Sequence, residues 1–551
     1  MKKYIPIISF EIQNCIKRFR HFMINRVYID YVLVAVLLLF VMAFSIWEGS
    51  YTYDPHHWGL MLSNAKDFAD GRIPYKDIFI QYGLLTTIVH AVAYRFFGSN
   101  LQSLIAVTSA FYALGLLGIY ILSRQITSSR KIAFFSFLSC LLLHPLAIYP
   151  WSNYIAFPFL VFGVLTLIKN KHSWGTLIFS GALFGAAVLA REGLLVAIVI
   201  FLLISSVYLF LINKNKIITL YLWTGFIGLI ALFFMYINIS GIYSYWYINS
   251  IILPGSYSKT FFTHGLLYQV GSMINMFLYG IYYLNSRIIF ISLIILSDIY
   301  FIINFMLKPL YEKEKLEKII LSIYSLLLIS SSLHLFEIFR FATGITVGAV
   351  LFYIIAKKYK VENIFFIVIS IFSLLSIFDL DKPAIRNSKG NGNYFYPTQT
   401  QLTAYPFRIE IPVFKGQKWS PIVFSYYSAI MNDLAEINKH NPHIKYQYNE
   451  TPDAFFSVLS PFKQYQYAPF GSGTFELQGF NNFRPDYNLE NRIINKDIII
   501  FATSTRSDHS DYTPPKGYDI VNSYEVPESY FFKGKKYMHI VAPKAFVTND
   551  N

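Results

Sequence analysis

The chain has 551 residues, of which 55% are hydrophobic and only 14% are charged. This composition excludes an ordinary soluble globular protein, and the apolar runs recur at about 20 residues, the length that crosses a bilayer. The formal net charge is +15, but Lys and Arg stand in short clusters between the apolar runs, as membrane orientation requires, so nucleic acid is excluded as a partner.

The pattern predicts a polytopic α-helical membrane protein with about eleven spans. The first apolar run follows basic residues and lacks a small-residue cleavage site, so we expect a retained anchor with the N-terminus in the cytoplasm. With the basic loops placed inside, the C-terminus lies outside. The spans are then expected at 29–47, 101–123, 131–148, 154–168, 173–190, 193–212, 217–238, 287–307, 317–335, 341–356 and 362–379.

Two further apolar segments must lie along the membrane surface for this topology to hold. Segments 83–97 and 266–283 each carry polar residues at helical spacing along one stripe, the pattern of an interfacial helix. If either crossed the bilayer, the basic loops after it would face outside. The transmembrane domain is therefore expected to be 1–379, with large outer loops at 48–100 and 239–286.

After residue 379 the apolar runs stop, and 380–551 is predicted to form a small extracytoplasmic α/β domain. Segment 424–440 has the periodicity of a helix. Strands are expected at 497–502, 518–524 and 537–541, with the turn Pro514-Pro515-Lys516-Gly517 between the first two of them.

The first outer loop concentrates ionisable residues directly after the first span. Asp54 precedes Pro55, and the following residues continue with helical periodicity to Gly71. One interpretation is structural, because Asp is a preferred N-cap, Pro suits a first helical turn and Gly ends a helix. The other is functional, because a carboxylate held at the membrane interface could take a proton from an acceptor hydroxyl. Asp54 is therefore a candidate catalytic base.

Glu48, His56 and His57 lie close to Asp54 in the sequence and could support it. Adjacent histidines on a helix point about 100° apart, which disfavours a metal site made of both. One of them, with Asp54 and Glu48, could still bind a divalent cation or donate a hydrogen bond to a phosphate. The alternative is that they are ordinary interfacial histidines.

Basic residues on the predicted outer face are candidate ligands of a lipid phosphate. Arg191 and Glu192 lie in a short turn between two apolar runs, and a charge at membrane depth costs about 2.5–3.5 kcal/mol, so it usually has a partner or a function. Either these two form an ion pair, or Arg191 binds a phosphate, whose oxygens a guanidinium matches. For Arg340 the alternatives are a salt bridge with Glu337, one helical turn away, or phosphate binding. Lys259 and His264 in the second outer loop could close over a lipid headgroup.

The sequence resembles the GT-C superfamily of glycosyltransferases that use polyprenyl-phosphate sugars, which includes protein O-mannosyltransferases and the lipid A aminoarabinose transferase. The motifs that carry the resemblance are Tyr53-Asp54-Pro55-His56-His57, Asp70-Gly71-Arg72-Ile73-Pro74-Tyr75-Lys76-Asp77, Gln81-Tyr82-Gly83, Phe97-Gly98 and the small-residue run 181–190 before Arg191-Glu192-Gly193.

The resemblance implies a specific chemistry. Asp54 would deprotonate the acceptor hydroxyl, which attacks the anomeric carbon with inversion as the lipid phosphate leaves, and basic side chains would stabilise the developing charge. Several relatives carry an arginine soon after the Phe-Gly turn, whereas 99–104 here has no basic residue. Phosphate binding is therefore expected from Arg191, Arg340, Lys259 or a histidine.

The leading prediction is a bacterial inner-membrane glycosyltransferase that modifies an outside-facing glycan or lipid. An O-antigen or polysaccharide polymerase or ligase is an alternative, although the long soluble tail fits it less well. A lipid-linked glycan flippase or transporter is a non-enzymatic alternative, but the ionisable residues gather at one face instead of mid-membrane. The expected partners are a polyprenyl-phosphate-linked sugar, a glycan or lipid acceptor and membrane lipids, with a divalent cation as the only possible cofactor.

Overall fold

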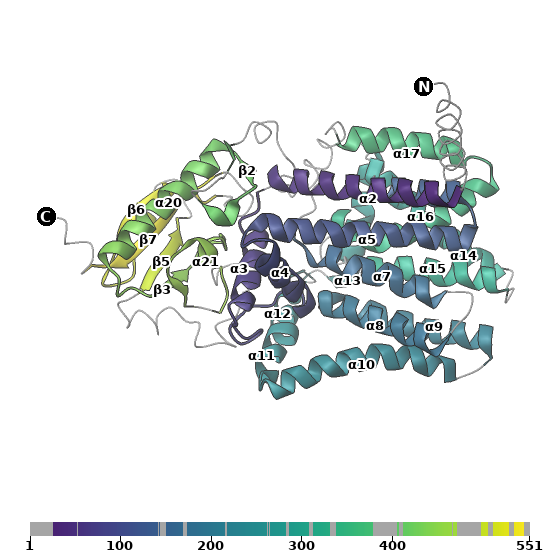
Figure 1. Cartoon of the computed structure of the whole chain (residues 1–551), viewed down its shortest axis with the longest axis horizontal. Helices are drawn as coiled ribbons and strands as arrows, with labels where there is room; N and C mark the ends of the chain where they lie inside the picture. The colour runs from purple at the N-terminus through teal and green to yellow at the C-terminus, as the bar shows by residue number, and fades with distance from the viewer. Residues whose placement is uncertain are drawn as a thin grey trace, which may run out of the picture.

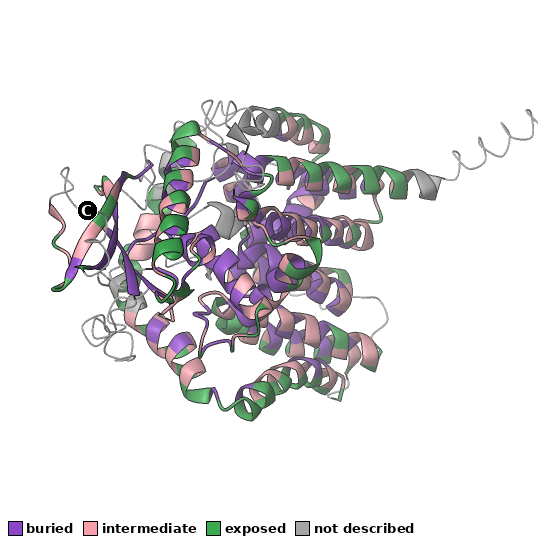
Figure 2. Cartoon of the chain, turned by 60° about the vertical axis from the view of Figure 1, so that its left-hand side comes forward, coloured by how far each residue is buried: buried purple, intermediate pink, exposed green. Residues whose placement is uncertain are grey.

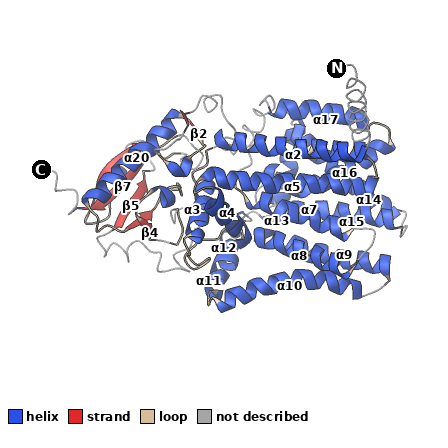
Figure 3. Cartoon of the chain, in the orientation of Figure 1, coloured by secondary structure: helices blue, strands red, loops and turns tan. Residues whose placement is uncertain are grey.

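The protein consists of a bundle of long helices and, at one end of it, a smaller unit that contains a sheet (Figure 1). All strands of the main sheet belong to this C-terminal unit, residues 405–544 (Figure 3). The computed structural model describes residues 26–51, 53–140, 143, 150–168, 173–214, 217–261, 263, 265–282, 286–307, 312–330, 338–377, 405–406, 411–465, 467–470, 498–504, 511–527 and 534–544.

The bundle is built from apolar helices, as expected where lipid surrounds a chain whose backbone must be hydrogen-bonded internally. Five of the described helices are long and apolar enough to cross a membrane: Asp30–Tyr51, Leu101–Thr127, Glu192–Asn213, Ile217–Ile239 and Arg287–Leu307. A multi-pass membrane protein is thus confirmed, and the number of eleven crossings stays a prediction. Each predicted span overlaps one of the helices α2 (Arg26–Tyr51), α5 (Leu101–Thr127), α6 (Arg130–Ser139), α7 (Ser152–Leu167), α8 (Trp174–Ala190), α9 (Leu195–Asn213), α10 (Ile217–Ile239), α14 (Ser286–Leu307), α15 (Lys313–Ser330), α16 (Ile338–Lys358) and α17 (Glu362–Ile377).

The small-residue run noted in the sequence is a helix-packing face. A Cβ atom on Gly181 of α8 would lie 1.9 Å from the carbonyl oxygen of Leu222 on α10. A Cβ atom on Gly225 of α10 would lie equally close, 1.9 Å, to the carbonyl oxygen of Ile178 on α8. Only glycine permits this approach of two backbones, which is a common way of packing helices in membranes. The contact fixes α8, and α8 ends directly before Arg191.

A layer of short helices lies at the end of the bundle that faces the C-terminal unit (Figure 1). It contains α3 (His57–Ala69) and α4 (Leu84–Phe97) from the first outer loop. It also contains α11 (Tyr243–Tyr247), the π-helix η2 (Ile248–Ile252) and α12 (Leu253–Phe261) from the second. Neither α4 nor α13 (Gly265–Tyr282) is among the five helices that are long and apolar enough to cross a membrane. Their interfacial position remains a prediction.

The C-terminal unit is an α/β structure with a five-stranded mixed sheet in the order β4-β3-β5-β7-β6. The helix and the three strands predicted from the sequence are confirmed as α20 (Pro421–His440), β5 (Ile498–Thr503), β6 (Tyr518–Glu525) and β7 (Tyr537–Pro543). Strands β3 (Tyr446–Asn449) and β4 (Lys463–Gln464), which run parallel to each other, were not predicted. They are short and polar, so they carry no alternating apolar signal. Two further short strands, β1 (Tyr405–Pro406) and β2 (Lys418–Trp419), pair outside this sheet.

Buried residues continue from the bundle into the C-terminal unit (Figure 2). One apolar cluster includes Trp58 of α3 and Leu104 of α5 together with Trp419 and Phe455 of the C-terminal unit. Such a shared core holds the two parts together by the hydrophobic effect. The C-terminal unit is therefore packed against the first outer loop, not connected to the bundle by the chain alone.

Asn249 of η2 joins three distant segments at this contact. Its side-chain amide donates to the carbonyl of Ile80, and its side-chain oxygen accepts the Ile80 N–H at 3.1 Å. The same oxygen accepts the hydroxyl of Tyr467 from the C-terminal unit. A buried amide that satisfies these groups ties the two outer loops and the C-terminal unit to each other.

Candidate active site

Asp54 caps the start of α3. Its Oδ1 accepts the backbone N–H groups of His56 at 3.1 Å and His57 at 2.9 Å. A carboxylate here satisfies N–H groups that a helix end leaves without partners, and its charge suits the positive end of the helix dipole. The structural interpretation of Asp54 is therefore confirmed. Since the side chain is also fully buried, its position is rigidly defined.

The second oxygen of Asp54 contacts a histidine. Oδ2 lies 3.0 Å from Nδ1 of His57. Because an ionised carboxylate can only accept, His57 Nδ1 is the donor in this hydrogen bond. The His57 ring lies 4.7 Å from the Trp151 ring between centroids, and Trp151 lies 4.9 Å from Tyr82. Asp54 and His57 thus form a hydrogen-bonded pair that faces two aromatic rings.

The guanidinium of Arg191 contacts Ser152, the residue that follows Trp151. The Arg191 side chain is buried, and its Nη1 donates to Ser152 Oγ at 3.1 Å. Ser152 begins α7 directly after Trp151, so His57 and Arg191 contact neighbouring residues at the start of this helix. This arrangement is named the acid–arginine cluster below. A small cavity beside it is lined by Asn153, Ala156, Leu160, Arg191, Leu194, Leu328, Thr343 and Gly344.

Glu192 has a different partner from Arg191. Its Oε1 accepts the hydroxyl of Tyr75 at 2.9 Å. Burial raises the pKa of Tyr75 well above its ordinary value, so this hydroxyl keeps its proton and donates. The first outer loop is fixed to the end of α8 a second time by Thr86, whose hydroxyl donates to the carbonyl of Ala190 at 2.8 Å. The loop therefore positions Arg191 from both sides.

The side chain of His56 contacts the C-terminal unit. Its Nδ1 lies 3.2 Å from the carbonyl oxygen of Pro452, and its ring lies 4.5 Å from the Phe470 ring, both in the C-terminal unit. Glu48 is buried near the end of α2. Among the residues whose placement is described, no three His, Cys, Asp or Glu side chains are arranged to hold a metal ion.

The remaining predicted phosphate ligands have different positions. Lys259 is exposed near the end of α12. Arg340 belongs to α16, but its side chain lies outside the described residues, as does the whole of His264. Of the predicted site residues, the structure brings Asp54 and His57 into contact, and Arg191 contacts the residue after the Trp151 that packs against His57.

Asp453 of the C-terminal unit is a buried acid that sequence reasoning missed. Its Oδ2 accepts the hydroxyl of Tyr427 at 2.6 Å, and its Oδ1 accepts the N–H of Phe455 at 2.9 Å. Burial raises the pKa of Asp453 to about 7, although both hydrogen bonds oppose the increase. The Tyr427 hydroxyl also lies 3.1 Å from the hydroxyl of Tyr53, the residue before Asp54. The local sequence around Asp453 indicates only a helix cap before the apolar pair Phe455-Phe456. It does not indicate the connection to Tyr53, because Tyr53 is 374 residues from Tyr427.

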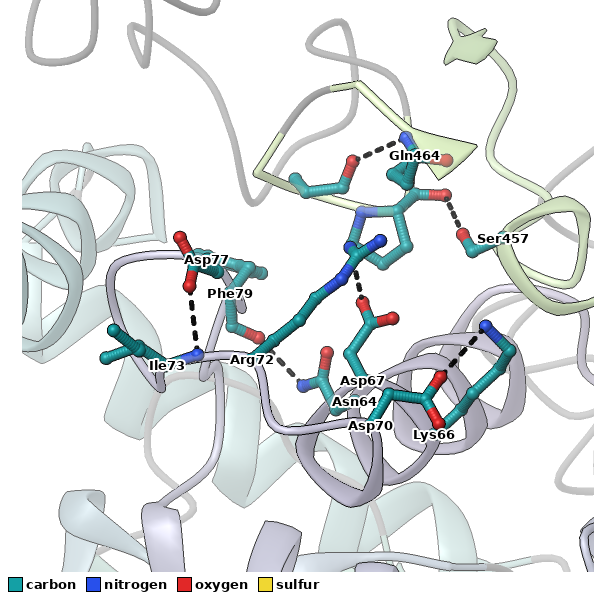
Figure 4. Close-up of polar contacts among 12 residues, drawn as sticks. Asn64, Lys66, Asp67, Asp70, Arg72, Ile73, Asp77, Phe79, Ser457 and Gln464 are labelled. Atoms are coloured by element: carbon teal, nitrogen blue, oxygen red, sulfur yellow. Dashed lines mark hydrogen bonds and ion pairs between the residues drawn. The ribbon is translucent and has the colours of Figure 1, made fainter. Parts of the chain in front are cut away.

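The far end of α3 is ordered by polar contacts within the second resembling motif (Figure 4). Arg72 Nη1 lies 3.2 Å from Asp67 Oδ2, and Asp77 Oδ2 accepts the N–H of Ile73 at 2.9 Å. The amide of Asn64 donates to the carbonyl of Phe79 at 2.8 Å. These contacts therefore hold the loop that leads from α3 towards Tyr82 in a defined conformation.

Comparison with solved structures finds several that match over most of the chain. The crystal structure of ArnT from Cupriavidus metallidurans bound to undecaprenyl phosphate matches with a TM-score of 0.51 and 12% identity, over 94% of this chain and 98% of that one. The apo state of the same ArnT matches with a TM-score of 0.49 and 13% identity, over 93% and 98% of the two chains. AglB, an archaeal oligosaccharyltransferase from Archaeoglobus fulgidus in complex with an inhibitory peptide and a dolichol-phosphate, matches with a TM-score of 0.48 and 11% identity, over 88% and 70%.

No protein-family model and no curated protein sequence matches the chain. The likeness to ArnT is therefore one of fold and not of sequence. It extends over nearly the whole of both chains, including the helical bundle and the C-terminal unit. The chain has the fold of ArnT, and the predicted resemblance to the GT-C polyprenyl-phosphate glycosyltransferases is confirmed at the level of the fold.

Proposed function

We propose that this protein is an inverting membrane glycosyltransferase that moves a sugar from a polyprenyl-phosphate donor to a glycan or lipid acceptor outside the cytoplasm. The observation that carries the proposal is the acid–arginine cluster, in which His57 links Asp54 to Trp151 and the buried Arg191 contacts the next residue, Ser152. The ArnT structure of similar fold is bound to undecaprenyl phosphate. That likeness supports a lipid-linked donor.

The cluster contains the two kinds of group that such a transfer needs. Asp54 is the proposed base that removes the acceptor proton. Three hydrogen bonds hold its carboxylate in one orientation. Arg191 is the proposed ligand of the donor phosphate. Its fixed positive charge would stabilise the negative charge that develops on the phosphate as the bond to the sugar breaks.

The contact between the first outer loop and the C-terminal unit supports the proposed orientation in a bacterial inner membrane. Pro55 accepts a backbone hydrogen bond from Ala454 at 2.9 Å, so the two regions must share one side of the membrane. The basic clusters between the apolar runs support a cytoplasmic position for the opposite end of the bundle. Both regions are therefore proposed to face the extracytoplasmic side, where Asp54 would meet its acceptor.

The experiment has two steps. First, polyprenyl-phosphate sugars are extracted from cells that lack this protein, and the species that accumulates identifies the donor. Second, transfer from that donor is measured in membranes with wild-type protein, Asp54→Asn and a control. We expect Asp54→Asn to reduce transfer by about 10²–10⁴-fold, the usual contribution of a positioned base.

Asn is the informative substitution because it is also a good N-cap, so α3 should keep its start while the charge is lost. Asp519→Asn is the matched control, since this partly exposed acid only pairs with Lys544 at 3.4 Å on the surface of the C-terminal unit. Near-normal transfer by a correctly inserted Asp54→Asn protein would exclude Asp54 from the mechanism.

A further inference from the structure

We propose that Asp453 of the C-terminal unit is a positioning residue for the transfer reaction and acts on Asp54 through a chain of two tyrosine hydroxyls. The tyrosines are Tyr427 of α20 and Tyr53, the residue before Asp54. This inference rests on the proposed function and adds to it a role for the C-terminal unit. It follows from buried hydrogen bonds on one side of the proposed base and a backbone contact on the other.

The three side chains form one chain of hydrogen bonds from the C-terminal unit to the first outer loop. The hydroxyl of Tyr427 donates to Asp453 Oδ2 at 2.6 Å. Because that hydroxyl has a single proton, Tyr53 is the donor in the contact of 3.1 Å between the two tyrosine hydroxyls. Burial and the nearby Asp453 raise the pKa of both tyrosines well above the ordinary value, so both hydroxyls keep their protons. The chain therefore runs from Tyr53 to the carboxylate.

The surroundings of this chain exclude solvent. Asp453 and Tyr427 are fully buried, and Tyr53 is nearly so. The Tyr53 ring also packs against Trp419 of the C-terminal unit, with 5.1 Å between the ring centroids. A hydrogen bond in such surroundings is stronger than one in water, and a buried polar group left without a partner is destabilising. The chain therefore fixes the Tyr53 side chain on the C-terminal unit.

Asp54 lies between two residues that the C-terminal unit holds. Tyr53 before it is held by the hydroxyl chain, and Pro55 after it accepts the N–H of Ala454 at 2.9 Å. Asp453 directly precedes Ala454, so one short segment supplies both contacts. A displacement of about 1 Å at a reacting group can cost roughly 100-fold in rate. Contacts on both sides of the proposed base therefore protect its alignment.

The charge of Asp453 sets the strength and direction of the chain. Burial raises the pKa of Asp453 to about 7. The titratable groups that face it are Tyr426 and Tyr427 of α20, Tyr53, and Asp54 and His56 at the start of α3. An ionised carboxylate can only accept and forms the stronger bond, whereas the neutral acid can donate to Tyr427 and reverse the chain. The chain is therefore best ordered above about pH 7.

The test uses Tyr53→Phe, Tyr427→Phe and Tyr426→Phe, each of which removes one hydroxyl and keeps the ring. It measures kcat and KM in membranes with the polyprenyl-phosphate sugar that accumulates in cells lacking this protein. Tyr426→Phe is the matched control, because the Tyr426 hydroxyl is buried but makes no hydrogen bond within the part of the chain that the structure describes. We expect Tyr53→Phe and Tyr427→Phe to lower kcat about 10- to 100-fold with little change in KM, and Tyr426→Phe to change neither.

Two further measurements separate positioning from a general loss of structure. The Ala454 amide should keep its protection from hydrogen exchange in all three variants, because its bond to Pro55 involves none of the hydroxyls. The kcat of the wild type should rise as the pH increases through about 7, and Asp453→Asn should lack this transition. Asn keeps an oxygen for the N–H of Phe455, which Asp453 accepts at 2.9 Å, but it has no charge to titrate.

The possible outcomes separate this inference from the proposed function. If Tyr53→Phe and Tyr427→Phe transfer as fast as Tyr426→Phe while Asp54→Asn is inactive, the role of Asp453 is refuted and the proposed function stands. An equal loss in Tyr426→Phe, or a loss of Ala454 protection alongside the loss of kcat, would indicate a structural effect and refute it too. So would an Asp453→Asn protein that keeps the wild-type pH transition. If Asp54→Asn also transfers normally, the proposed function itself is wrong.

Discussion

Gly59 of α3 is a position where one added methyl group tests the contact between the first outer loop and the C-terminal unit. A Cβ atom there would lie 2.6 Å from the backbone nitrogen of Phe455 and 2.7 Å from the carbonyl carbon of Ala454. Both are backbone atoms, which cannot rotate away as a side chain can. In Gly59→Ala, the segment around Ala454 must therefore move away from α3.

The expected magnitude follows from the cost of overpacking. Extra carbon in a well-packed contact costs roughly 1–3 kcal/mol, which corresponds to a weakening of the contact by about 5- to 150-fold. The substitution also stabilises α3 itself by about 0.5–1 kcal/mol, because Ala is a better helix former than Gly. Gly228→Ala isolates that second effect, since Gly228 lies within α10 and has no atom within 4 Å of its added Cβ.

Hydrogen exchange of the Ala454 amide is the direct assay, because this N–H donates to the carbonyl of Pro55 at 2.9 Å across the contact. Gly59→Ala should increase its exchange rate by the factor above, while amides within β5 and β7 keep their protection. Gly228→Ala should change neither. An Ala454 amide that remains as protected in Gly59→Ala as in the wild type would refute the described packing of the C-terminal unit on α3.

Three further predictions address charge and orientation. Arg191→Ala should raise the KM for the lipid-linked donor about ten- to a hundredfold, which corresponds to the loss of a charged hydrogen bond. Lys66→Ala should not, because Lys66 pairs with Asp70 at 3.4 Å on the surface of α3. Equal effects of the two substitutions would make Arg191 purely structural. Burial raises the pKa of Asp67 from 3.8 to about 6, so the folded state binds more protons than the unfolded state and loses stability as the pH rises through that window. The melting temperature of Asp67→Asn relative to wild type should therefore increase from pH 4 to pH 7. A difference that stays constant over this range would contradict the prediction. A reporter fused after Val547 should be active only outside the cytoplasm, and cytoplasmic activity would overturn the topology.

Local patterns were sufficient for the long helices and for strands β5, β6 and β7 of this protein. The positions of the helices follow from the length of the apolar runs, because a bilayer sets that length. The cap at Asp54 follows from a short-range preference, because a carboxylate at a helix start satisfies N–H groups two and three residues away. Strand β5 is a nearly continuous apolar run, and β6 and β7 are bounded by turn residues, which are typical strand signals.

The partners of the charged residues could not be predicted in the same way. Arg191 and Glu192 suggested an ion pair because they are neighbours in the sequence, yet they contact Ser152 and Tyr75. Tyr75 and Glu192 are 117 residues apart, so no local signal joins them. The same applies to Asp453, whose connection to Tyr53 depends on how the C-terminal unit packs on the first outer loop.

The sequence by itself thus determined that the chain is a multi-pass membrane protein with an acidic residue at the start of a helix in the segment after its first apolar run. It did so because apolar length, charge clusters and helix caps act over a few residues. Only the tertiary structure decided that this acid contacts a histidine that packs against Trp151, and that Arg191 contacts the next residue, Ser152. Those contacts join segments that are far apart in the chain, and they exist only once α3, α7 and α8 are packed together.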